Sequence, residues 1–442
     1  MFFNIWLAVA VTALMLGNPA GAATSNVRNT LHNLSTSGTG SIKATDGQTQ
    51  VCVFCHTPHN ASTAVNGPLW NRNTSGSTYT RYTSSSLDAN TIANGFTAQP
   101  AGSSLLCLSC HDGMVALGNV RVLNGQTNAA IAINGSTTTK MPDGSVANTG
   151  FSRNLGTDLT NDHPISVTYN DALATADGEM RHLDASQRYP AGAPAPGTSS
   201  VIGLRSSGVK PLLPLQATGV GGLGQVQCAT CHDPHITNQK FLRLNRFQTT
   251  APPAGGEFIQ ANDIICLACH SKMGTEWSNS VHANSTTADE VYTAAAAATR
   301  QFPAGTTVWQ AACLNCHDTH TVPGARRLLR EGTDSINSPK TGGNSAIEET
   351  CYQCHRDPID PARIIGTSTG TVPNIKTEFE RAVHMPIKTN DQGGGGHTVE
   401  EHDITNADFI ETAANLGAGN TAKRHAECPD CHNPHRVIRN EL

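Results

Sequence analysis

Seven copies of one five-residue pattern, Cys-x-x-Cys-His, carry the chemistry that this sequence can perform, and they use all 14 cysteines. The copies are Cys52, Cys55 and His56; Cys107, Cys110 and His111; Cys228, Cys231 and His232; Cys266, Cys269 and His270; Cys313, Cys316 and His317; Cys351, Cys354 and His355; and Cys428, Cys431 and His432. This spacing is the attachment signature of haem c. Positions i, i+3 and i+4 of a helical turn share a face, so two thiols can bond to one porphyrin edge while the histidine reaches its iron. The sequence therefore predicts seven haem c groups, each with the motif histidine as proximal ligand.

Other uses of closely spaced cysteines are zinc knuckles, a disulfide framework and thioredoxin-like redox pairs. None of them requires a histidine after every second cysteine, whereas all seven copies have one. Because seven motifs take up the 14 cysteines, the haem prediction leaves none for a disulfide or for a lipid anchor.

Twelve of the 19 histidines remain once the seven motif histidines are subtracted, so each iron can have a second, distal histidine. Some of them stand three residues after a motif histidine: His59, His235, His320 and His435. The motif histidine already holds the near face of its own haem, and the far face lies across the porphyrin. We therefore expect His59, His235 and His320 to bind the haem of the following motif, at His111, His270 and His355 respectively.

The remaining haems need distal ligands from farther along the chain. One histidine precedes each at a suitable distance: His32 for the first haem, His163 for the third, His282 for the fifth and His384 for the seventh. His425 and His402 compete with His384 for the seventh haem. His435 has the form of a ligand for a following haem, and we hypothesise that it, or His32, ligates a haem of a neighbouring subunit. The alternative is an exposed surface histidine.

The first 22 residues have the form of a secretory signal peptide. An apolar run from Ile5 to Leu16 is followed by the small residues Ala20-Gly21-Ala22, and we expect cleavage near Ala22. An anchoring helix is the alternative, but the run is too short to span a bilayer. The expected location is therefore secreted, either extracellular or on the cell surface, or else periplasmic, with no membrane span.

The composition is thin for a long globular chain, with 38% hydrophobic and 5% aromatic residues. Removing 22 residues from 442 leaves 420, or 60 for each of the seven motifs. We expect the porphyrins to supply most of the core, with mostly irregular coil and short α-helices wrapped around the seven haems and little or no β-sheet. The formal charge of −5 argues against a nucleic-acid partner.

The motifs come in couples, each with a leading and a trailing member. From first cysteine to first cysteine, the third and fourth motifs are 38 residues apart, as are the fifth and sixth, which indicates an internal repeat. We expect a signal peptide at 1–22, an N-terminal segment at 23–188 with haems one and two, a Pro/Gly linker at 189–200 and a C-terminal segment at 201–442 with haems three to seven. A capping box at Thr287 and Glu290 predicts a helix that ends at Arg300.

Several stretches resemble the multihaem cytochromes that are built from doubled Cys-x-x-Cys-His motifs: residues 31–38, 52–60, 107–117, 163–166 and 228–235. More narrowly, the chain looks like the extracellular cytochrome nanowires of metal-reducing bacteria. This resemblance implies closely stacked haems, a head-to-tail homopolymer in which one distal histidine comes from the next subunit, and redox partners upstream and downstream. The count of seven departs from the even counts of the examples in that group.

We expect an electron-transfer protein and not an enzyme: a heptahaem cytochrome that conducts electrons through bis-histidine haems as a subunit of an extracellular filament. One alternative is a soluble periplasmic electron carrier, which differs in its partner. The other is a multihaem reductase, which needs an iron with an open coordination position. All seven motifs end in histidine with ligands to spare, which favours the conductor.

Overall fold

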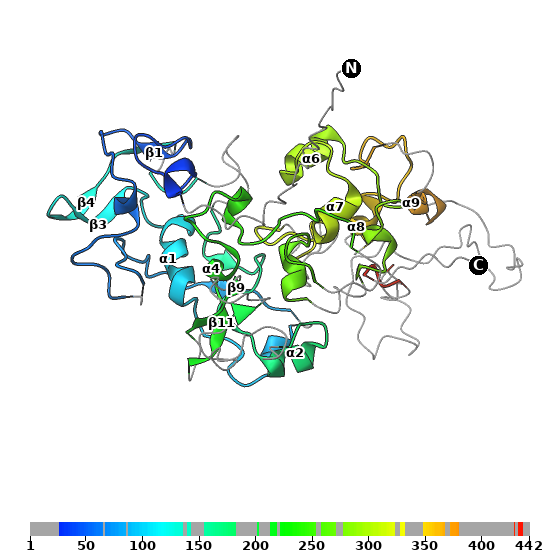
Figure 1. Cartoon of the computed structure of the whole chain (residues 1–442), viewed down its shortest axis with the longest axis horizontal. Helices are drawn as coiled ribbons and strands as arrows, with labels where there is room; N and C mark the ends of the chain where they lie inside the picture. The colour runs from blue at the N-terminus through cyan, green and yellow to red at the C-terminus, as the bar shows by residue number, and fades with distance from the viewer. Residues whose placement is uncertain are drawn as a thin grey trace, which may run out of the picture.

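The computed structural model describes residues 26–64, 67–84, 87–135, 139–142, 154–182, 201–202, 213–218, 222–252, 258–270, 277–322, 328–331, 348–366, 372–379, 428 and 432–435. The expected signal peptide and the linker at 189–200 lie outside these residues. The described chain is mostly coil, with short helices and a few small sheets. Figure 1 shows an elongated arrangement in which the order of the chain broadly follows the long axis, from β1, β3 and β4 at one end to α8 and α9 at the other.

The helices are short because few segments have the length or pattern for more. The α-helices are α1 (Gly102–His111), α2 (Asp171–Asp177), α4 (Cys228–Cys231), α6 (Ala294–Arg300), α7 (Val308–Ala311), α8 (Glu348–Tyr352) and α9 (Ile375–Phe379). The 3-10 helices are η1 (Val27–Asn29), η2 (Cys52–Phe54), η3 (Asp88–Asn90), η5 (Gln239–Phe241), η6 (Ile265–Ala268), η7 (Val281–Ala283) and η8 (Ala312–Asn315). Motifs one to six all fall on one of these helices or on the residues that follow it.

The strands are also short: β1 (Lys43–Ala44), β2 (Thr80–Arg81), β3 (Asn119–Leu123), β4 (Gln126–Ala130), β5 (Ile133–Asn134), β6 (Asp158–Leu159), β7 (Val167–Thr168), β8 (Val201–Ile202), β9 (Leu213–Pro214), β10 (Gln216–Ala217) and β11 (Gly224–Val226). They form sheets of two or three strands, β1-β5, β10-β11-β7, β2-β6, β3-β4 and β8-β9. The expectation of little or no sheet is thus only partly right.

The β3-β4 hairpin is the longest pairing described, and its signal was present in the sequence. Asn124 and Gly125 both have positive φ, 49° and 83°, as a two-residue hairpin turn requires. Gly118 precedes the hairpin and accepts a hydrogen bond from the Ile131 N–H at 2.9 Å. A side-chain carbon on Gly118 would collide with the carbonyl oxygen of Ile131. Glycine is therefore required where the two backbones approach.

Strands from both sides of the expected linker share one sheet. In that sheet β11 lies between β10 and β7, with Val226 opposite Val167 and Gln225 opposite Thr168. The segments before and after residues 189–200 are consequently packed against each other.

The helix expected from Thr287 begins later than the capping box predicted. Helix α6 starts at Ala294, where the hydroxyl of Thr293 accepts a bond from the Ala296 N–H, and it ends at Arg300 as expected. Thr293 supplies the N-cap because the β-bridge between Val291 and Thr307 holds the preceding residues in extended backbone.

The buried apolar residues form separate clusters rather than one core. The largest surrounds Trp277, Tyr292 and Phe302, and it includes partly buried cysteines from the fourth, fifth and sixth motifs. A second cluster around Tyr169 and Leu213 reaches Cys269, and a third around Phe54 reaches Cys55. Motif cysteines thus lie at the edges of the apolar clusters, between one cluster and the next.

Polar groups hold the centre of the N-terminal half. Arg72 is 0% exposed, and its guanidinium donates to four backbone carbonyls between Ser109 and Asn119. Tyr79 donates to the Asp112 carboxylate at 2.8 Å, and burial together with that hydrogen bond raises the pKa of the Tyr79 phenol to about 12. These bonds fasten the second motif to the chain that precedes it.

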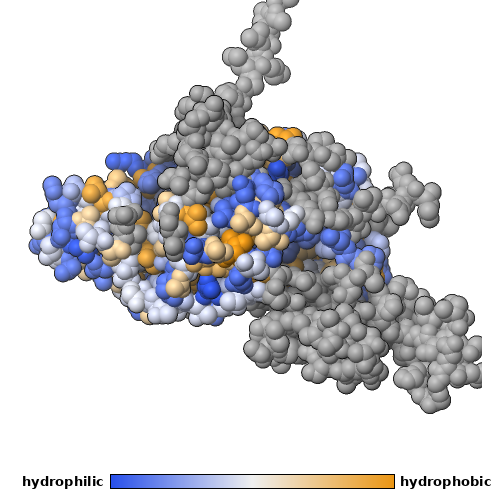
Figure 2. Space-filling model, turned by 90° about the horizontal axis from the view of Figure 1, so that it is seen from below, coloured by the Kyte–Doolittle hydropathy of each residue, from blue (hydrophilic) through white to orange (hydrophobic). Residues whose placement is uncertain are grey.

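The visible surface is mostly hydrophilic or neutral, with small separate apolar patches (Figure 2). Some large apolar side chains are nevertheless exposed, among them Leu31 at 55%, Leu69 at 55% and Met114 at 48%. Within the described part of the chain, no helix is long and apolar enough to cross a membrane.

Candidate metal centres along the chain

Most of the motifs form a single closed helical turn. The N–H of the motif histidine donates to the carbonyl of the first cysteine, at 2.8 Å for His56, 2.9 Å for His232, 3.1 Å for His270, 3.0 Å for His317, 2.9 Å for His355 and 2.8 Å for His432. The second motif forms the last turns of α1. The spacing predicted such a turn, which places positions i, i+3 and i+4 on one face.

A polar clamp, which the sequence analysis missed, fixes several of these turns. One residue donates through its side chain to the residue after the first cysteine and through its N–H to the second cysteine. In the first motif the clamp is Asn71, with bonds of 2.6 Å to the Val53 carbonyl and 2.8 Å to the Cys55 carbonyl. Arg243, Arg181 and Arg330 do the same in the third, fourth and fifth motifs, with side-chain bonds of 2.9 Å each.

The spacing of the clamps contained a weak signal. Asn71 follows the second cysteine of its motif by 16 residues, Arg243 by 12 and Arg330 by 14. Arg181 instead precedes its motif, so no single sequence offset describes the set. The clamp therefore becomes visible only in the folded chain.

Motif histidines face other histidines at one recurring distance. The ring centroids are 6.2 Å apart for His56 and His235, His111 and His32, His232 and His320, and His317 and His435, and 6.3 Å apart for His355 and His282. The interplanar angles range from 13° to 70°. Each pair joins one motif histidine to one histidine outside the Cys-x-x-Cys-His pattern.

This distance is too long for ring contact and has a simple geometric meaning. A nitrogen–metal bond of about 2 Å and about 1.1 Å from nitrogen to ring centre put two imidazoles on one metal ion about 6.2 Å apart, centre to centre. The angle between the rings is then free to vary, as it does here. The residues of each pair would therefore fit one metal ion between the two rings, as the predicted haem iron requires.

The fourth motif has a less direct partner. Burial lowers the pKa of His270 to about 4, and the charge of His163 is the next largest cause. His163 therefore acts electrostatically on His270, while the pKa of His163 itself is lowered by burial and by the charge of His320.

The partners differ from those expected for the histidines that follow a motif. His235 faces His56 of the first motif and His320 faces His232 of the third, each in the preceding couple instead of its own. The loop after His232 closes on its own motif through two bonds of 2.9 Å from Arg243, one from its backbone N–H to Cys231 and one from its side chain to Ala229. His235 lies in this loop and faces His56.

Two of the histidines that precede a couple are also shifted by one motif. His32 faces His111, in the second motif instead of the first, and His282 faces His355, in the sixth instead of the fifth. His163 lines a pocket with Cys228 and His320 of the third motif's surroundings, and its charge also lowers the pKa of His270 in the fourth motif. The expected ligand residues recur in the pairs, but with other motifs. The histidines that follow a motif face leading motifs, whereas His32 and His282, which precede a couple, face trailing motifs.

The remaining predicted ligands have separate outcomes. His435 faces His317 of the same chain, so it is neither an isolated surface histidine nor directed at a second copy. His59 is exposed, and no ring faces it among the described residues. His384, His402, His425 and Cys431 lie outside the described residues.

Burial favours the neutral form of several of these imidazoles. Desolvation is the largest cause of the lowered pKa of His32, His232, His270 and His355, which is about 4 in each case. A neutral imidazole has the free lone pair that a metal ligand needs. The described residues contain no group of three or more histidine, cysteine or acidic side chains that could hold a metal ion together.

The second ring nitrogen, Nδ1, is fixed by an acceptor in most of the pairs. For five of these histidines it is a backbone carbonyl, at 2.6 Å for His56, 2.8 Å for His232, 3.1 Å for His163, 3.3 Å for His282 and 3.2 Å for His355. For His235 and His320 the acceptor is instead a carboxylate, Asp233 at 2.9 Å and Asp162 at 3.1 Å. These contacts orient each ring with Nε2 toward its partner.

The thiols show that consecutive motifs are neighbours. Cys228 is the largest cause of the raised pKa of the Cys107 thiol, and Cys313 is the largest cause of the raised pKa of the Cys266 thiol, which makes motifs two and three, and four and five, close neighbours. Electrostatic coupling between thiols links the other neighbours: Cys55 with Cys110, Cys231 with Cys266 and Cys354 with Cys316. Motifs one to six thus lie in one row in the order of the sequence.

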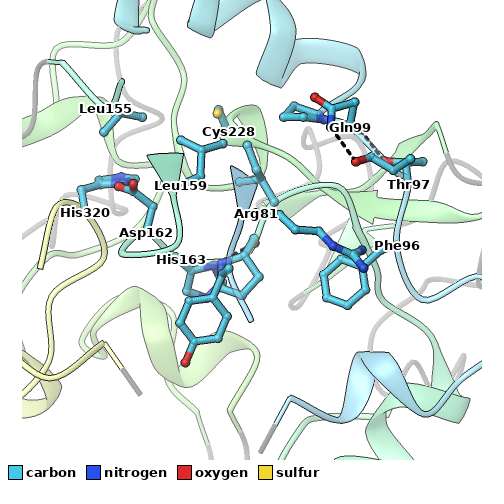
Figure 3. Close-up of a pocket in the computed structure, with 15 residues that line it drawn as sticks. Arg81, Phe96, Thr97, Gln99, Leu155, Leu159, Asp162, His163, Cys228 and His320 are labelled. Atoms are coloured by element: carbon cyan, nitrogen blue, oxygen red, sulfur yellow. Dashed lines mark hydrogen bonds and ion pairs between the residues drawn. The ribbon is translucent and has the colours of Figure 1, made fainter. Parts of the chain in front are cut away.

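Figure 3 shows the surroundings of the third motif. Cys228, His320, Asp162 and His163 line one pocket, together with apolar side chains that include Leu155 and Leu159. Burial opposes the charged form of His320, but the hydrogen bond and charge of Asp162 outweigh it and raise the pKa of this imidazole.

No family model matches the chain, and no curated protein matches it significantly.

Proposed function

We propose that the chain is an electron-transfer protein that carries seven covalently attached c-type haems. The observation that carries the proposal is the recurring separation of 6.2–6.3 Å between a motif histidine and a second histidine. Two imidazoles complete the coordination of an iron and leave no position for a substrate, so the group would supply one-electron chemistry alone.

The surroundings of the pairs also suit porphyrins. Leu31 and Leu69 are exposed apolar side chains adjacent in sequence to His32 and to the acceptor Pro68, and the exposed Met114 follows His111 by three residues; a porphyrin face would cover such groups. Buried guanidinium nitrogens of Arg330 and Arg363 have no hydrogen-bond partner, although both arginines bond to backbone carbonyls of motifs. Haem propionates are acceptors of the right charge for them.

The row of motifs supports conduction along the molecule. Thiols of neighbouring motifs are in contact or electrostatically coupled from the first motif to the sixth. Haems attached to these thiols would be close enough for electrons to hop between neighbours. The chain, wrapped around them as coil, would set spacing, orientation and potential.

We propose further that copies assemble head to tail, as a secreted filament. Within the chain, the second histidine of motifs three, five and seven faces motifs one, three and five. By the same rule His59, which is exposed, would bind the iron at His432 of a second copy. This replaces His435 and His32 as the crossing ligand, because both face motif histidines of their own chain.

The test of the cofactor is the haem content of the protein matured in a host that attaches haem c. We expect seven haems per chain by pyridine haemochrome assay and mass spectrometry, and a low-spin ferric spectrum. The double variant Cys107→Ser, Cys110→Ser should retain six. A chain that matures without covalent haem, or with bound zinc, would refute the proposal.

The test of assembly compares two exposed histidines. His59→Ala should abolish filaments in electron micrographs, whereas His182→Ala, whose side chain is 55% exposed and lies 3.6 Å from Asp171, should leave them intact. Filaments of normal length from His59→Ala would rule out this histidine as the crossing ligand.

A further inference from the structure

A buried carboxylate stands behind one of the paired histidines. The Asp162 side chain is 4% exposed, and its Oδ1 lies 3.1 Å from Nδ1 of His320. The Thr321 N–H donates to the same oxygen at 3.1 Å. The other carboxylate oxygen of Asp162 is buried and has no hydrogen-bond partner. Asp162 thus directs its hydrogen-bonded oxygen at His320, and among the described residues no lysine or arginine forms an ion pair with it.

The backbone fixes this contact from both sides. The His163 N–H donates to the Thr319 carbonyl at 2.8 Å, and the Val322 N–H donates to the Asn161 carbonyl at 3.1 Å. Asp162 and His320 lie between these two bonds, and Figure 3 shows them side by side. The geometry is therefore built into the chain and does not depend on a mobile side chain.

The other carboxylate of this kind is different in two ways. Asp233 bonds to Nδ1 of His235 at 2.9 Å, but its side chain is 21% exposed. Its second oxygen lies 3.2 Å from Nη1 of Arg243, which offsets the charge. The pair His282 and His355 serves as a comparison without a carboxylate, because Nδ1 of each ring contacts an uncharged backbone carbonyl.

We propose that Asp162 is a positioning residue that lowers the reduction potential of the iron held between His232 and His320. This inference rests on the proposed function, since it presumes the iron. A carboxylate that accepts from Nδ1 makes the imidazole a stronger donor, and its buried negative charge favours Fe(III) over Fe(II). Asp162 would hold the proton at Nδ1 of His320 throughout, and the site would gain one electron from one neighbouring haem and lose one electron to the other.

The position in the row gives the effect a consequence. The third motif lies between the second and the fourth. Because Asp162 lowers its reduction potential, its iron would be reduced after the iron between His282 and His355, whose imidazoles bond only to backbone carbonyls. Electrons placed on it would leave readily toward either neighbour. Asp162 would in this way act on the whole row from a single site.

The experiment is a potentiometric titration of the seven-haem protein, followed by the haem absorption bands. Asp162→Asn should raise the reduction potential of one component by about 59 mV, which corresponds to a tenfold change in the equilibrium constant for a one-electron reduction. Asp233→Asn, the matched control, should shift its component less. His320→Met, which raises the potential by changing the ligand, identifies the component, and Asp162→Asn must move the same one.

The outcomes separate this inference from the proposed function. A protein without haem would remove the proposed function itself. A seven-haem Asp162→Asn protein with the wild-type titration curve, or with a shift in another component, would overturn only the role of Asp162. If Asp162→Asn does not mature, Asp162→Glu is measured instead, because it keeps the charge. A wild-type potential in Asp162→Glu supports the role of that charge, and a potential raised by about 59 mV contradicts it.

Discussion

Replacement of His235 by alanine is the sharpest test of the shifted pairing. In the structure His235 faces His56 at 6.2 Å, and His232 of its own motif faces His320 instead. The substitution should therefore open one iron, the one at His56, and leave the other six with two histidines. One-seventh of the ferric iron should become high-spin, and the reduced protein should bind one carbon monoxide per chain.

The location of the open iron distinguishes two pairings of His235. The structure pairs it with His56, whereas the sequence spacing predicted the haem at His270. Adding Cys52→Ser and Cys55→Ser to the His235→Ala chain should remove the first haem, and the high-spin signal with it. Adding Cys266→Ser and Cys269→Ser should leave that signal in place.

Electron paramagnetic resonance measures the high-spin fraction, and carbon monoxide titration counts the open sites. His182→Ala is the control and should produce neither signal. A high-spin signal that survives loss of the first haem but vanishes with the fourth would refute the pairing inferred from the ring distances.

Three other substitutions test how the chain supports the sites. Arg72→Met should lower the free energy of unfolding by at least about 3 kcal/mol, because it leaves several buried carbonyls without donors. The control Arg121→Met removes a partly exposed side chain and should lower this free energy less. Chemical denaturation measures both values, and equal losses would contradict the role of Arg72. Tyr79→Phe should cost about 1–3 kcal/mol at pH 7. Because the folded state raises the pKa of this phenol to about 12, the difference should persist below pH 10 and shrink as the pH rises toward 12, in denaturation curves taken at each pH; a constant difference would be evidence against the bond. Gly118→Ala should destabilise the β3-β4 hairpin, because its new methyl group meets backbone, while Gly40→Ala meets a side-chain atom at 3.5 Å and should be tolerated; similar thermal melting of the two would argue against the close approach.

The types of residue in the sites could be predicted from the sequence, but their pairing could not. The five-residue spacing determines a helical turn by itself, so the motif geometry follows from local rules. Whether His235 faces the first or the fourth motif depends on how the loop from His232 to Arg243 closes. That closure depends on a side chain eleven residues from the histidine, which no local pattern describes.

The fold class was predictable for a similar reason, and only in part. A low content of apolar residues excludes a large core, and mostly coil was the outcome. The small sheets were missed because strands of two residues, such as β7, have no alternation to detect. Asn124-Gly125 was a usable hairpin signal, because alternating residues such as Val120 and Val122 precede it. Asp162 was invisible in the sequence because its partner His320 lies 158 residues away.

The shifted pairing has a consequence for the order of assembly. His56 is paired with His235, which emerges 179 residues later, His232 with His320, 88 residues later, and His317 with His435, 118 residues later. If the chain carries the proposed haems, a leading motif could receive its porphyrin as soon as it is exported, but its iron would lack a second histidine until His235, His320 or His435 has also been exported. The leading sites would therefore be completed one after another, each only after a later motif has been delivered.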